Sequence, residues 1–305
     1  MKVNVNGISI ITCSVKPEIC EKMLESVKNT IGTNHETIIF DNREKNLGIC
    51  QVYNTCASKA NFPYLCFIHE DIIIPTPNWG TSMVSFVEKT PNCGIIGFAG
   101  GTVAKRNFLG WGLDSKGRYR YYDPCVIEKS KVQIRNGLSY KYNNPENEDF
   151  AKVVTLDGLF LFVKKVIWEE YSFDENEIKG FQFYDADFSF GIAQKYQNYV
   201  CLIADIYHFS GGKIDKAYYE NARIFQNKWR SALPHIIGAQ RINLIDEMND
   251  AKRLFVQSIR YGFTLIETIE HFLRINGVFF FLVFCVLIPI WGGKKILRKI
   301  SKYVF

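Results

Sequence analysis

The apolar positions of this chain follow two alternating patterns, short unbroken runs and longer segments with helical spacing. The unbroken runs, which are typical of buried strands, occupy residues 8–13, 36–42, 64–68 and 94–100. The segments between them show helical periodicity, which predicts helices that start at Pro17, after Gly48 and after Thr76. Strands that alternate with helices through short connections predict an α/β protein with a mostly parallel central sheet and helices on both faces.

The second half of the chain is less regular. Residues 108–154 mix short apolar runs with polar turns, which indicates antiparallel strands and loops. Apolar runs at residues 159–165 and 200–208 predict two more buried strands. Between them, residues 184–196 begin with acidic residues and continue with helical spacing.

In the first half of the chain, we expect Thr76 to cap the third helix, because Thr and Pro are common at helix starts.

The pattern changes after Pro234, which places a predicted domain boundary there. Residues 1–233 are expected to form the α/β domain, and residues 234–305 a C-terminal helical region. The apolar residues of this second region share one helical face; they are Phe255, Ile259, Phe263 and Ile266.

The end of the helical region has the features of a membrane-associated segment. Residues 277–291 carry no charge, although a spanning helix needs roughly 20 apolar residues. In the tail 294–305, five cations lie opposite apolar residues at helical spacing. We expect this segment to span the membrane or to lie in its cytoplasmic surface. The alternative is a buried core helix followed by a solvated basic end.

Composition narrows the class of protein further. At 305 residues, 47% apolar and 22% charged, the chain is globular. The net charge is +6, and five of these excess charges lie in the tail 294–305. The remainder is nearly neutral, so no nucleic-acid partner is expected. Nine cysteines without C-x-x-C spacing, and an N-terminus without a cleavable signal pattern, favour the cytoplasm.

Polar residues follow the first three predicted strands, and the carboxyl ends of parallel strands meet at one edge of a sheet. The third strand is followed by His69, Glu70 and Asp71. Two residues apart, His69 and Asp71 point to one side while Glu70 points to the other. An imidazole and a carboxylate suit a hard divalent cation such as Mn²⁺. The alternative is that these residues only cap the following turn.

This stretch resembles the metal-binding DXD segment of family 2 glycosyltransferases with the GT-A fold, with His69 in the place of the first Asp. Further segments resemble the same family in the expected order over about the first 215 residues. They are ISIITCSVKP (8–17), IIFDN (38–42), NLGICQVYNTCASKA (46–60), TLDGLFLFVKK (155–165), FYDADFSFGIAQK (183–195) and HFSGG (208–212). In the fifth segment Tyr184 stands where the family usually has Glu.

The resemblance implies a role for each matched residue. Asp185 is expected to be the general base, with Asp187 as the fallback. The cation, Mn²⁺ or Mg²⁺, is expected to bind His69, Asp71 and His208. The expected donor-binding residues are Thr12, Ser14, Asp41, Asn46, Asn54 and Glu70. The expected acceptor-binding residues are Asp157 and Gly158, with Trp111 added because an indole can stack on a sugar ring.

The leading hypothesis is a bacterial-type, metal-dependent inverting glycosyltransferase. It would use a nucleotide-sugar donor and a glycan or lipid-linked acceptor at the cytoplasmic face of the membrane. One alternative is a non-catalytic nucleotide-sugar-binding scaffold on the same fold. Another is a metal-dependent hydrolase that uses His69, Asp71 and His208.

Overall fold

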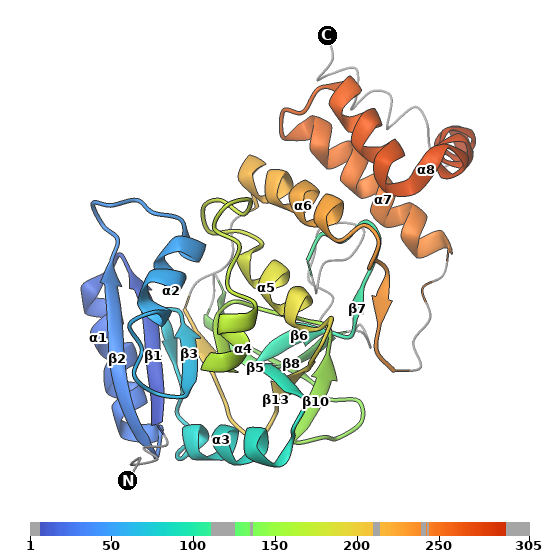
Figure 1. The fold of residues 1–305 in the computed structure, drawn as a ribbon. Helices are drawn as coiled ribbons and strands as arrows, with labels where there is room; N and C mark the ends of the chain where they lie inside the picture. Colours follow the sequence, from blue (N-terminus) through green and yellow to red (C-terminus); the bar gives the residue numbers. More distant parts are fainter. Residues whose placement is uncertain are drawn as a thin grey trace.

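A seven-stranded sheet forms the centre of the protein (Figure 1). The computed structural model describes residues 7–110, 126–134, 137–209, 214–238, 242 and 244–290. The strand order is β10-β13-β5-β12-β3-β1-β2. In chain order these strands are β1 (Gly7–Ser14), β2 (Asn34–Asp41), β3 (Tyr64–Ile68), β5 (Cys93–Gly97), β10 (Phe150–Val153), β12 (Phe160–Lys164) and β13 (Gln197–Cys201).

The sheet is mixed, which corrects the prediction of a mostly parallel sheet. β1 runs parallel to β2 and β3, as predicted, and β13 runs parallel to β5. β12 runs antiparallel to both of its neighbours, β3 and β5, and β10 runs antiparallel to β13. A strand that runs parallel to its neighbour needs a long crossover connection. β12 instead follows β11 (Thr155–Leu156) after only three residues. It therefore enters the sheet at the edge where β3 ends and runs in the opposite direction.

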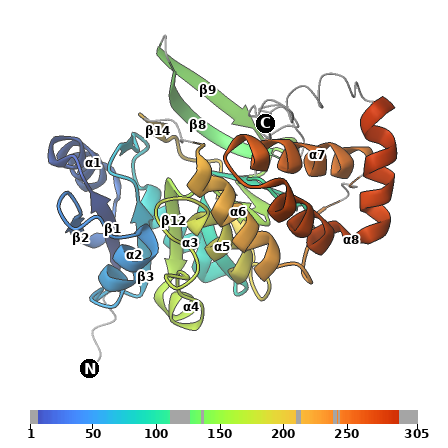
Figure 2. The ribbon, with the colours of Figure 1, turned by 90° about the horizontal axis from the view of Figure 1, so that it is seen from above.

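A second sheet lies beside the first, in the order β11-β6-β8-β14-β4, with β9 paired to β8. Its other strands are β4 (Ile72–Ile73), β6 (Ala99–Gly101), β8 (Val126–Ile134), β9 (Gly137–Asn143) and β14 (Tyr207–His208). The predicted strands 94–100 and 200–208 are therefore each two strands, one in each sheet. The antiparallel β8–β9 hairpin, predicted within residues 108–154, projects from the body of the molecule (Figure 2).

Helices cover both faces of the large sheet, as predicted. One core layer lies under α1 (Pro17–Thr30) and α3 (Trp79–Lys89) and includes Ile8 and Ile10 of β1. The opposite layer includes Ile11 and lies under α2 (Ile49–Ala57), α4 (Lys165–Glu170) and α5 (Tyr184–Ile192). The two-residue period of the strands thus sends alternate apolar side chains into two separate cores.

The start of α3 differs from the prediction. The residue before the helix is Asn78, in the left-handed region at φ 60°, and not Thr76. The Thr76 hydroxyl instead accepts a hydrogen bond from the backbone N–H of Asp205. The first turn of α3 packs directly on the chain at Ile31, where a side chain at Gly80 would collide with the Ile31 carbonyl.

The C-terminal part consists of α6 (Lys216–Lys228), α7 (Leu244–Arg260) and α8 (Leu265–Ile290), which pack together above α5 (Figures 1 and 2). The single helical face predicted from Phe255 to Ile266 is wrong, because α7 ends at Arg260 and the chain turns at Gly262. A capping box between Thr264 and Glu267 then starts α8.

The predicted membrane segment forms the second half of α8. The backbone breaks at Gly277 (φ 79°, ψ 166°), and the apolar residues after it form a short helix. Within the part of the chain that the structure describes, none of the helices has the length and apolar character needed to cross a membrane. The tail 294–305 lies outside the described residues. The boundary after residue 233 stays a prediction, although β15 (His235–Ile236) still pairs with β7 (Val103–Ala104).

Candidate functional site

Three parallel strand ends and one strand of the second sheet meet at the candidate site. β1 and β2 end together, where the N–H of Asn42 donates to the Ser14 carbonyl. β3 ends at Ile68, so the His69–Asp71 segment begins at the same edge. β14 pairs with β4, and the N–H of Phe209 donates to the Asp71 carbonyl at 3.0 Å. This pairing brings His208 beside a segment that is far away in the sequence.

The three predicted cation ligands lie close together. Ligand atoms of His69, Asp71 and His208 all lie within 4.8 Å of one another. Nε2 of His208 is 3.5 Å from Oδ1 of Asp71, and the two imidazole rings are 5.8 Å apart. Two imidazoles and one carboxylate are ligands that suit Mn²⁺ and other divalent transition metals. The residues present therefore fit a single divalent cation.

The surroundings shift the pKa values of the two histidines in opposite directions. Burial and the neighbouring His208 lower the pKa of His69, so its imidazole is neutral, the form that binds metals. Burial alone would lower the pKa of His208 as well, but the hydrogen bond and charge of Asp71 outweigh it and raise this pKa. Because a histidine ligand must be deprotonated, a cation that binds here would compete with protonation of His208.

Glu70 points away from this cluster, as the two-residue period predicts. Its Oε2 accepts hydrogen bonds from the Ser14 hydroxyl at 2.7 Å, and from the N–H groups of Val15 and Lys16 at 3.1 and 3.0 Å. The carboxylate thus closes the turn between β1 and α1. Ser14 and Glu70, which were both predicted to bind the donor, thus contact each other.

Asp185 lies in the first turn of α5 and faces the turn between β11 and β12. Its Oδ2 accepts from the N–H of Gly158 at 2.9 Å, and its Oδ1 accepts from the N–H of Ala186 at 2.8 Å. Burial and the nearby charge of Asp157 raise the pKa of Asp185 to about 7. A carboxyl group with this pKa is suited to accept a proton at neutral pH.

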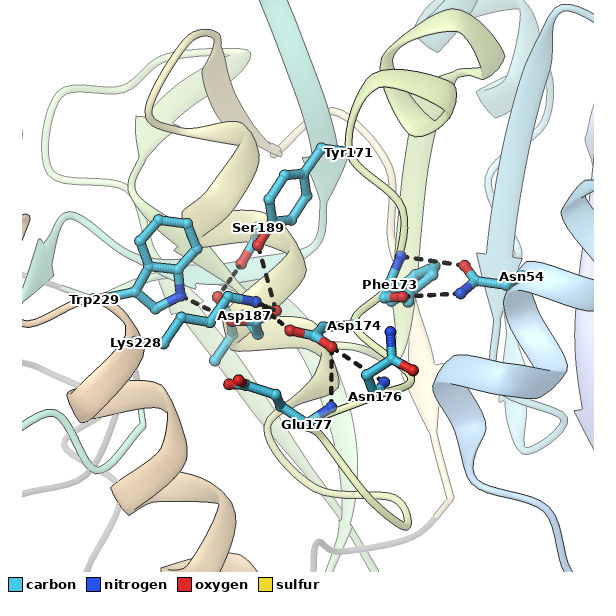
Figure 3. A network of polar contacts seen from close by, with 11 residues as sticks. Asn54, Tyr171, Phe173, Asp174, Asn176, Glu177, Asp187, Ser189, Lys228 and Trp229 are labelled. Atoms are coloured by element: carbon cyan, nitrogen blue, oxygen red, sulfur yellow. Dashed lines mark hydrogen bonds and ion pairs between the residues drawn. The ribbon is translucent and has the colours of Figure 1, made fainter.

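Asp187, the fallback base of the sequence prediction, does not share this environment. Its side chain is buried, and its carboxylate accepts from Nζ of Lys228 at 2.9 Å and from Nε1 of Trp229 at 2.8 Å (Figure 3). Lys228 also pairs with Asp174 at 2.7 Å. This ion-pair network attaches α5 to α6, on the side of α5 away from Gly158.

Two predicted donor-binding residues, Asn54 and Thr12, make hydrogen bonds within the protein. The amide of Asn54 donates to the Phe173 carbonyl at 2.8 Å, and its oxygen accepts from the Phe173 N–H at 3.2 Å (Figure 3). Asn54 thereby holds the loop between α4 and α5. Thr12 is buried within β1, where its hydroxyl donates to the Ile68 carbonyl of β3.

The remaining predicted residues have different surroundings. Asp41 is exposed at the end of β2 and pairs with Arg43. Asn46 is exposed and has a left-handed backbone at φ 49°. Asp157 and Gly158 form the turn beside Asp185. Trp111 lies outside the described residues.

Two residues of the site have no role in the sequence prediction. Tyr184, noted only for replacing Glu, places its hydroxyl 2.7 Å from Nε2 of His69. Glu128 of β8 is buried, and burial raises its pKa to about 7, with the charge of Asp157 acting in the same direction. Glu128 could not be found from the sequence, because it reaches the site through the pairing of β8 with β6. In that pairing Glu128 lies opposite Ala99, whose carbonyl accepts from the N–H of Asp157.

Comparisons with known proteins identify the family and the fold of this chain. A model of a glycosyltransferase-like family matches residues 9–229. No curated protein gives a significant match. Among solved structures, GalNAc-T7 with UDP, GalNAc and Mn²⁺ superposes with a TM-score of 0.52 at 11% identity, over 99% of this chain and 59% of that chain. The chain thus spans 59% of the length of that relative.

A second similar structure is the fragment 1–349 of TarS from S. aureus. Its complex with UDP superposes with a TM-score of 0.53 at 11% identity, covering 89% of this chain and 81% of that chain. Its complex with UDP-GlcNAc superposes with a TM-score of 0.53 at 12% identity, over 88% and 81% of the two chains. At these identities the likeness shows the fold. Together with the family match, it confirms the resemblance read from the sequence: the chain belongs to the glycosyltransferase-like family, in its family 2-like group, and has a GT-A type of fold.

Proposed function

We propose that this protein transfers a sugar from a nucleoside diphosphate donor to a hydroxyl group of an acceptor, with inversion at the anomeric carbon. The observation that carries the proposal is the pairing of two features at one sheet edge. One is the cation-binding cluster of His69, Asp71 and His208. The other is the Asp185 carboxyl group, whose pKa is raised to about 7.

These residues support a single displacement. The acceptor oxygen attacks the anomeric carbon, and the bond from that carbon to the diphosphate oxygen breaks. The proton of the acceptor hydroxyl passes to Asp185, and the nucleoside diphosphate leaves with the bonding electrons. A divalent cation held by His69, Asp71 and His208 would neutralise charge on the diphosphate. The Gly158 N–H donates to Oδ2 of Asp185 and so holds the base in place.

The donor is proposed to be a uridine nucleotide sugar that binds together with Mn²⁺. TarS has been solved with UDP and UDP-GlcNAc, and GalNAc-T7 with UDP and Mn²⁺. Both resemble this chain in fold. Two exposed residues are proposed to contact the donor: Asp41 at the end of β2, and Asn46 in the loop before α2.

The acceptor is proposed to be a glycan or lipid-linked molecule at the cytoplasmic face of a membrane. After the break at Gly277, α8 exposes large apolar side chains, with Val278 65% and Leu282 58% exposed. The sequence then continues into the basic tail 294–305. Exposed apolar side chains next to a cationic segment favour a position in the membrane surface.

The catalytic proposal is tested by calorimetric titration with a panel of nucleoside diphosphates, with and without Mn²⁺. We expect Mn²⁺-dependent binding that Asp71→Ala abolishes. Glu169→Ala, which removes an exposed carboxylate from α4, is the control and should bind like the wild type. Binding that ignores both Mn²⁺ and Asp71 would overturn the cation role. Binding without any sugar transfer or donor hydrolysis would favour the scaffold alternative.

The membrane proposal is tested by flotation with vesicles that contain anionic lipids. The double variant Val278→Lys/Leu282→Lys places charges on the exposed face of α8 and should lose vesicle binding. Val166→Lys, at an apolar position of α4 that is 60% exposed, is the matched control and should float with the vesicles. Equal flotation of both variants would contradict attachment through α8.

A further inference from the structure

The hydroxyl group of Tyr184 lies between two partners at the cation-binding cluster. It is 3.1 Å from the carbonyl oxygen of Gly158 and 2.7 Å from Nε2 of His69. The Tyr184 side chain is buried, and its ring packs near Tyr53 and Phe173. The hydroxyl therefore has a fixed position and two fixed neighbours.

The turn at Gly158 is shaped around this hydroxyl. A Cβ atom at position 158 would lie 2.1 Å from the Tyr184 oxygen and 3.0 Å from Cβ of Asp185. Any other residue at this position would displace the tyrosine. The absence of a side chain at Gly158 is thus a condition for the contact between Tyr184 and His69.

The direction of the two hydrogen bonds follows from the chemistry of the partners. A carbonyl oxygen can only accept, so the Tyr184 hydroxyl donates its one proton to Gly158. The lone pair of the hydroxyl then faces Nε2 of His69, which must carry a proton to donate in return. A histidine that binds a cation is neutral and carries a single ring proton. That proton is on Nε2, and Nδ1 keeps its lone pair.

We propose that Tyr184 is a positioning residue that holds His69 in the Nε2–H tautomer and so presents Nδ1 as the ligand for a divalent cation. The proposal deepens the proposed function, since it rests on a cation binding at this cluster. Among the described residues, no hydrogen bond is made by Nδ1 of His69. Histidines that bind metals are generally oriented in this way by a second partner on the other nitrogen.

A tyrosine can do this without adding charge to the site. Burial raises the pKa of Tyr184 well above its ordinary value, so the hydroxyl stays neutral beside Asp157 and Asp185. A carboxylate in the same position would place a third negative charge next to these two acids. Tyr184 thus orients the imidazole and leaves the charge balance of the site to the acids and the cation.

The first test reads the tautomer in the full-length, metal-free protein. Two-bond proton–nitrogen NMR correlations of the ¹⁵N-histidine-labelled protein, recorded at pH 8, distinguish protonated from bare ring nitrogens. His69→Gln identifies the signals of His69 by their loss. We expect a protonated Nε2 and a bare Nδ1. A proton on Nδ1 would overturn the proposal, whether or not the protein transfers sugar.

The second test compares Tyr184→Phe with Tyr53→Phe. Both remove one hydroxyl from the same buried aromatic cluster, but the Tyr53 hydroxyl makes no hydrogen bond to any residue that the structure describes. Loss of an outer-shell partner typically weakens metal binding about 10- to 100-fold. We expect this loss for Mn²⁺ titrated into Tyr184→Phe, together with a mixture of His69 tautomers, and neither change in Tyr53→Phe.

The outcomes separate this inference from the proposed function. Equal Mn²⁺ affinity and an unchanged tautomer in Tyr184→Phe would overturn the positioning role, even in an active enzyme. A wild-type protein that does not bind Mn²⁺ at all would overturn the ligand role of Nδ1. The predicted tautomer and Mn²⁺ affinities in a protein without transferase activity would support the positioning role and count against the proposed function.

Discussion

Asp185 and Asp187 lie two residues apart in the first turn of α5, yet their carboxyl groups have different surroundings. Asp185 faces the Gly158 turn and the charge of Asp157, whereas Asp187 is buried against Lys228 and Trp229. The sequence motif could not separate the two. Because successive helical residues point about 100° apart, residues at i and i+2 face opposite sides of the helix.

For Asp185→Asn, we expect sugar transfer to fall by about 100- to 10,000-fold, the usual contribution of a general base. The base must be deprotonated, so kcat/KM of the wild type should rise with pH and level off above about 7, the pKa of Asp185. Initial rates between pH 5.5 and 9 test both points. A flat pH profile, or a variant that keeps wild-type activity, would remove Asp185 from this role.

The same variant should also differ in stability in a defined pH window. The folded-state pKa of Asp185 is raised from 3.8 to about 7, so folding favours its protonated form. The stability that this proton contributes is present below pH 3.8 and is lost as the pH rises through 7. The melting temperature of Asp185→Asn minus that of the wild type should therefore be larger at pH 8 than at pH 5. A more stable variant at pH 8 would show that its lost activity comes from the missing base and not from unfolding.

Asp187→Asn should mainly reduce stability. It leaves Lys228 with a weaker partner in a buried network, and breaking a buried ion pair typically costs about 3 kcal/mol or more. Denaturant unfolding measures this free energy. The control Asp41→Asn removes an exposed pair with Arg43, where little change is expected. Equal stability of the two variants would contradict a structural role for Asp187.

At the scale of elements, Glu70 joins the end of β3 to the start of α1. Helix α1 has no side-chain cap of its own at Lys16, and the Glu70 carboxylate accepts from the N–H groups of Val15 and Lys16 in its place. A negative charge near a helix N-terminus is also favourable. Lys16, just before the helix, and Glu70, just after the strand, are 54 residues apart in the sequence, so the two elements stabilise each other across the fold.

Glu70→Gln should lower the free energy of unfolding by roughly 1.5–3 kcal/mol, the range for a hydrogen bond to a charged group. Thermal and denaturant unfolding measure it. Glu18→Gln, an exposed acid in the first turn of the same helix, is the control for a simple loss of charge. A Glu70→Gln variant of unchanged stability that no longer binds nucleoside diphosphate would favour the donor-binding role instead.

At the scale of the whole molecule, the C-terminal helices are attached to the loop before residue 111 through buried polar contacts. Nε2 of His271 in α8 is 2.6 Å from Oε1 of Gln226, whose Nε2 donates to the Phe108 carbonyl. Nearby, the amides of Asn107 and Asn276 exchange two hydrogen bonds at 2.8 and 3.0 Å. Asn276 directly precedes the break in α8 at Gly277.

Acid should weaken this attachment. Burial, with the charges of Arg223 and Arg274, lowers the pKa of His271 from 6.5 to about 3. The stability that the neutral imidazole contributes is complete above pH 6.5 and is lost as the pH falls towards 3. Each pH unit in this window costs about 1.4 kcal/mol when one proton must be taken up.

The matched test is the melting temperature between pH 8 and 4 for His271→Gln and for the control His35→Gln, at the start of β2. His271→Gln should flatten the pH dependence relative to the wild type, whereas the control should keep it. The same slope in all three proteins would show that other groups cause the acid sensitivity.

Much of the fold was predictable from the sequence, because local patterns encode it. β1, β2, β3 and the helices between them have the expected ranges, since long apolar runs and strong helical spacing depend on neighbouring residues alone. The edge where these strands end was predictable for the same reason, and with it the positions of His69 and Asp71. The predictions failed at Phe98 and after Cys201, where one apolar run continues through two sheets.

The sequence by itself therefore determined the family, the strand and helix types, and the residues from which a cation site and a base could be chosen. The tertiary structure decided which of them meet. The antiparallel entry of β12 places Gly158 beside Asp185, and the pairing of β14 with β4 brings His208 to Asp71. It also gave Asn54, Thr12 and Asp187 their partners within the protein. The physical reason is that a side chain's partners come from elements distant in sequence, which no local periodicity encodes.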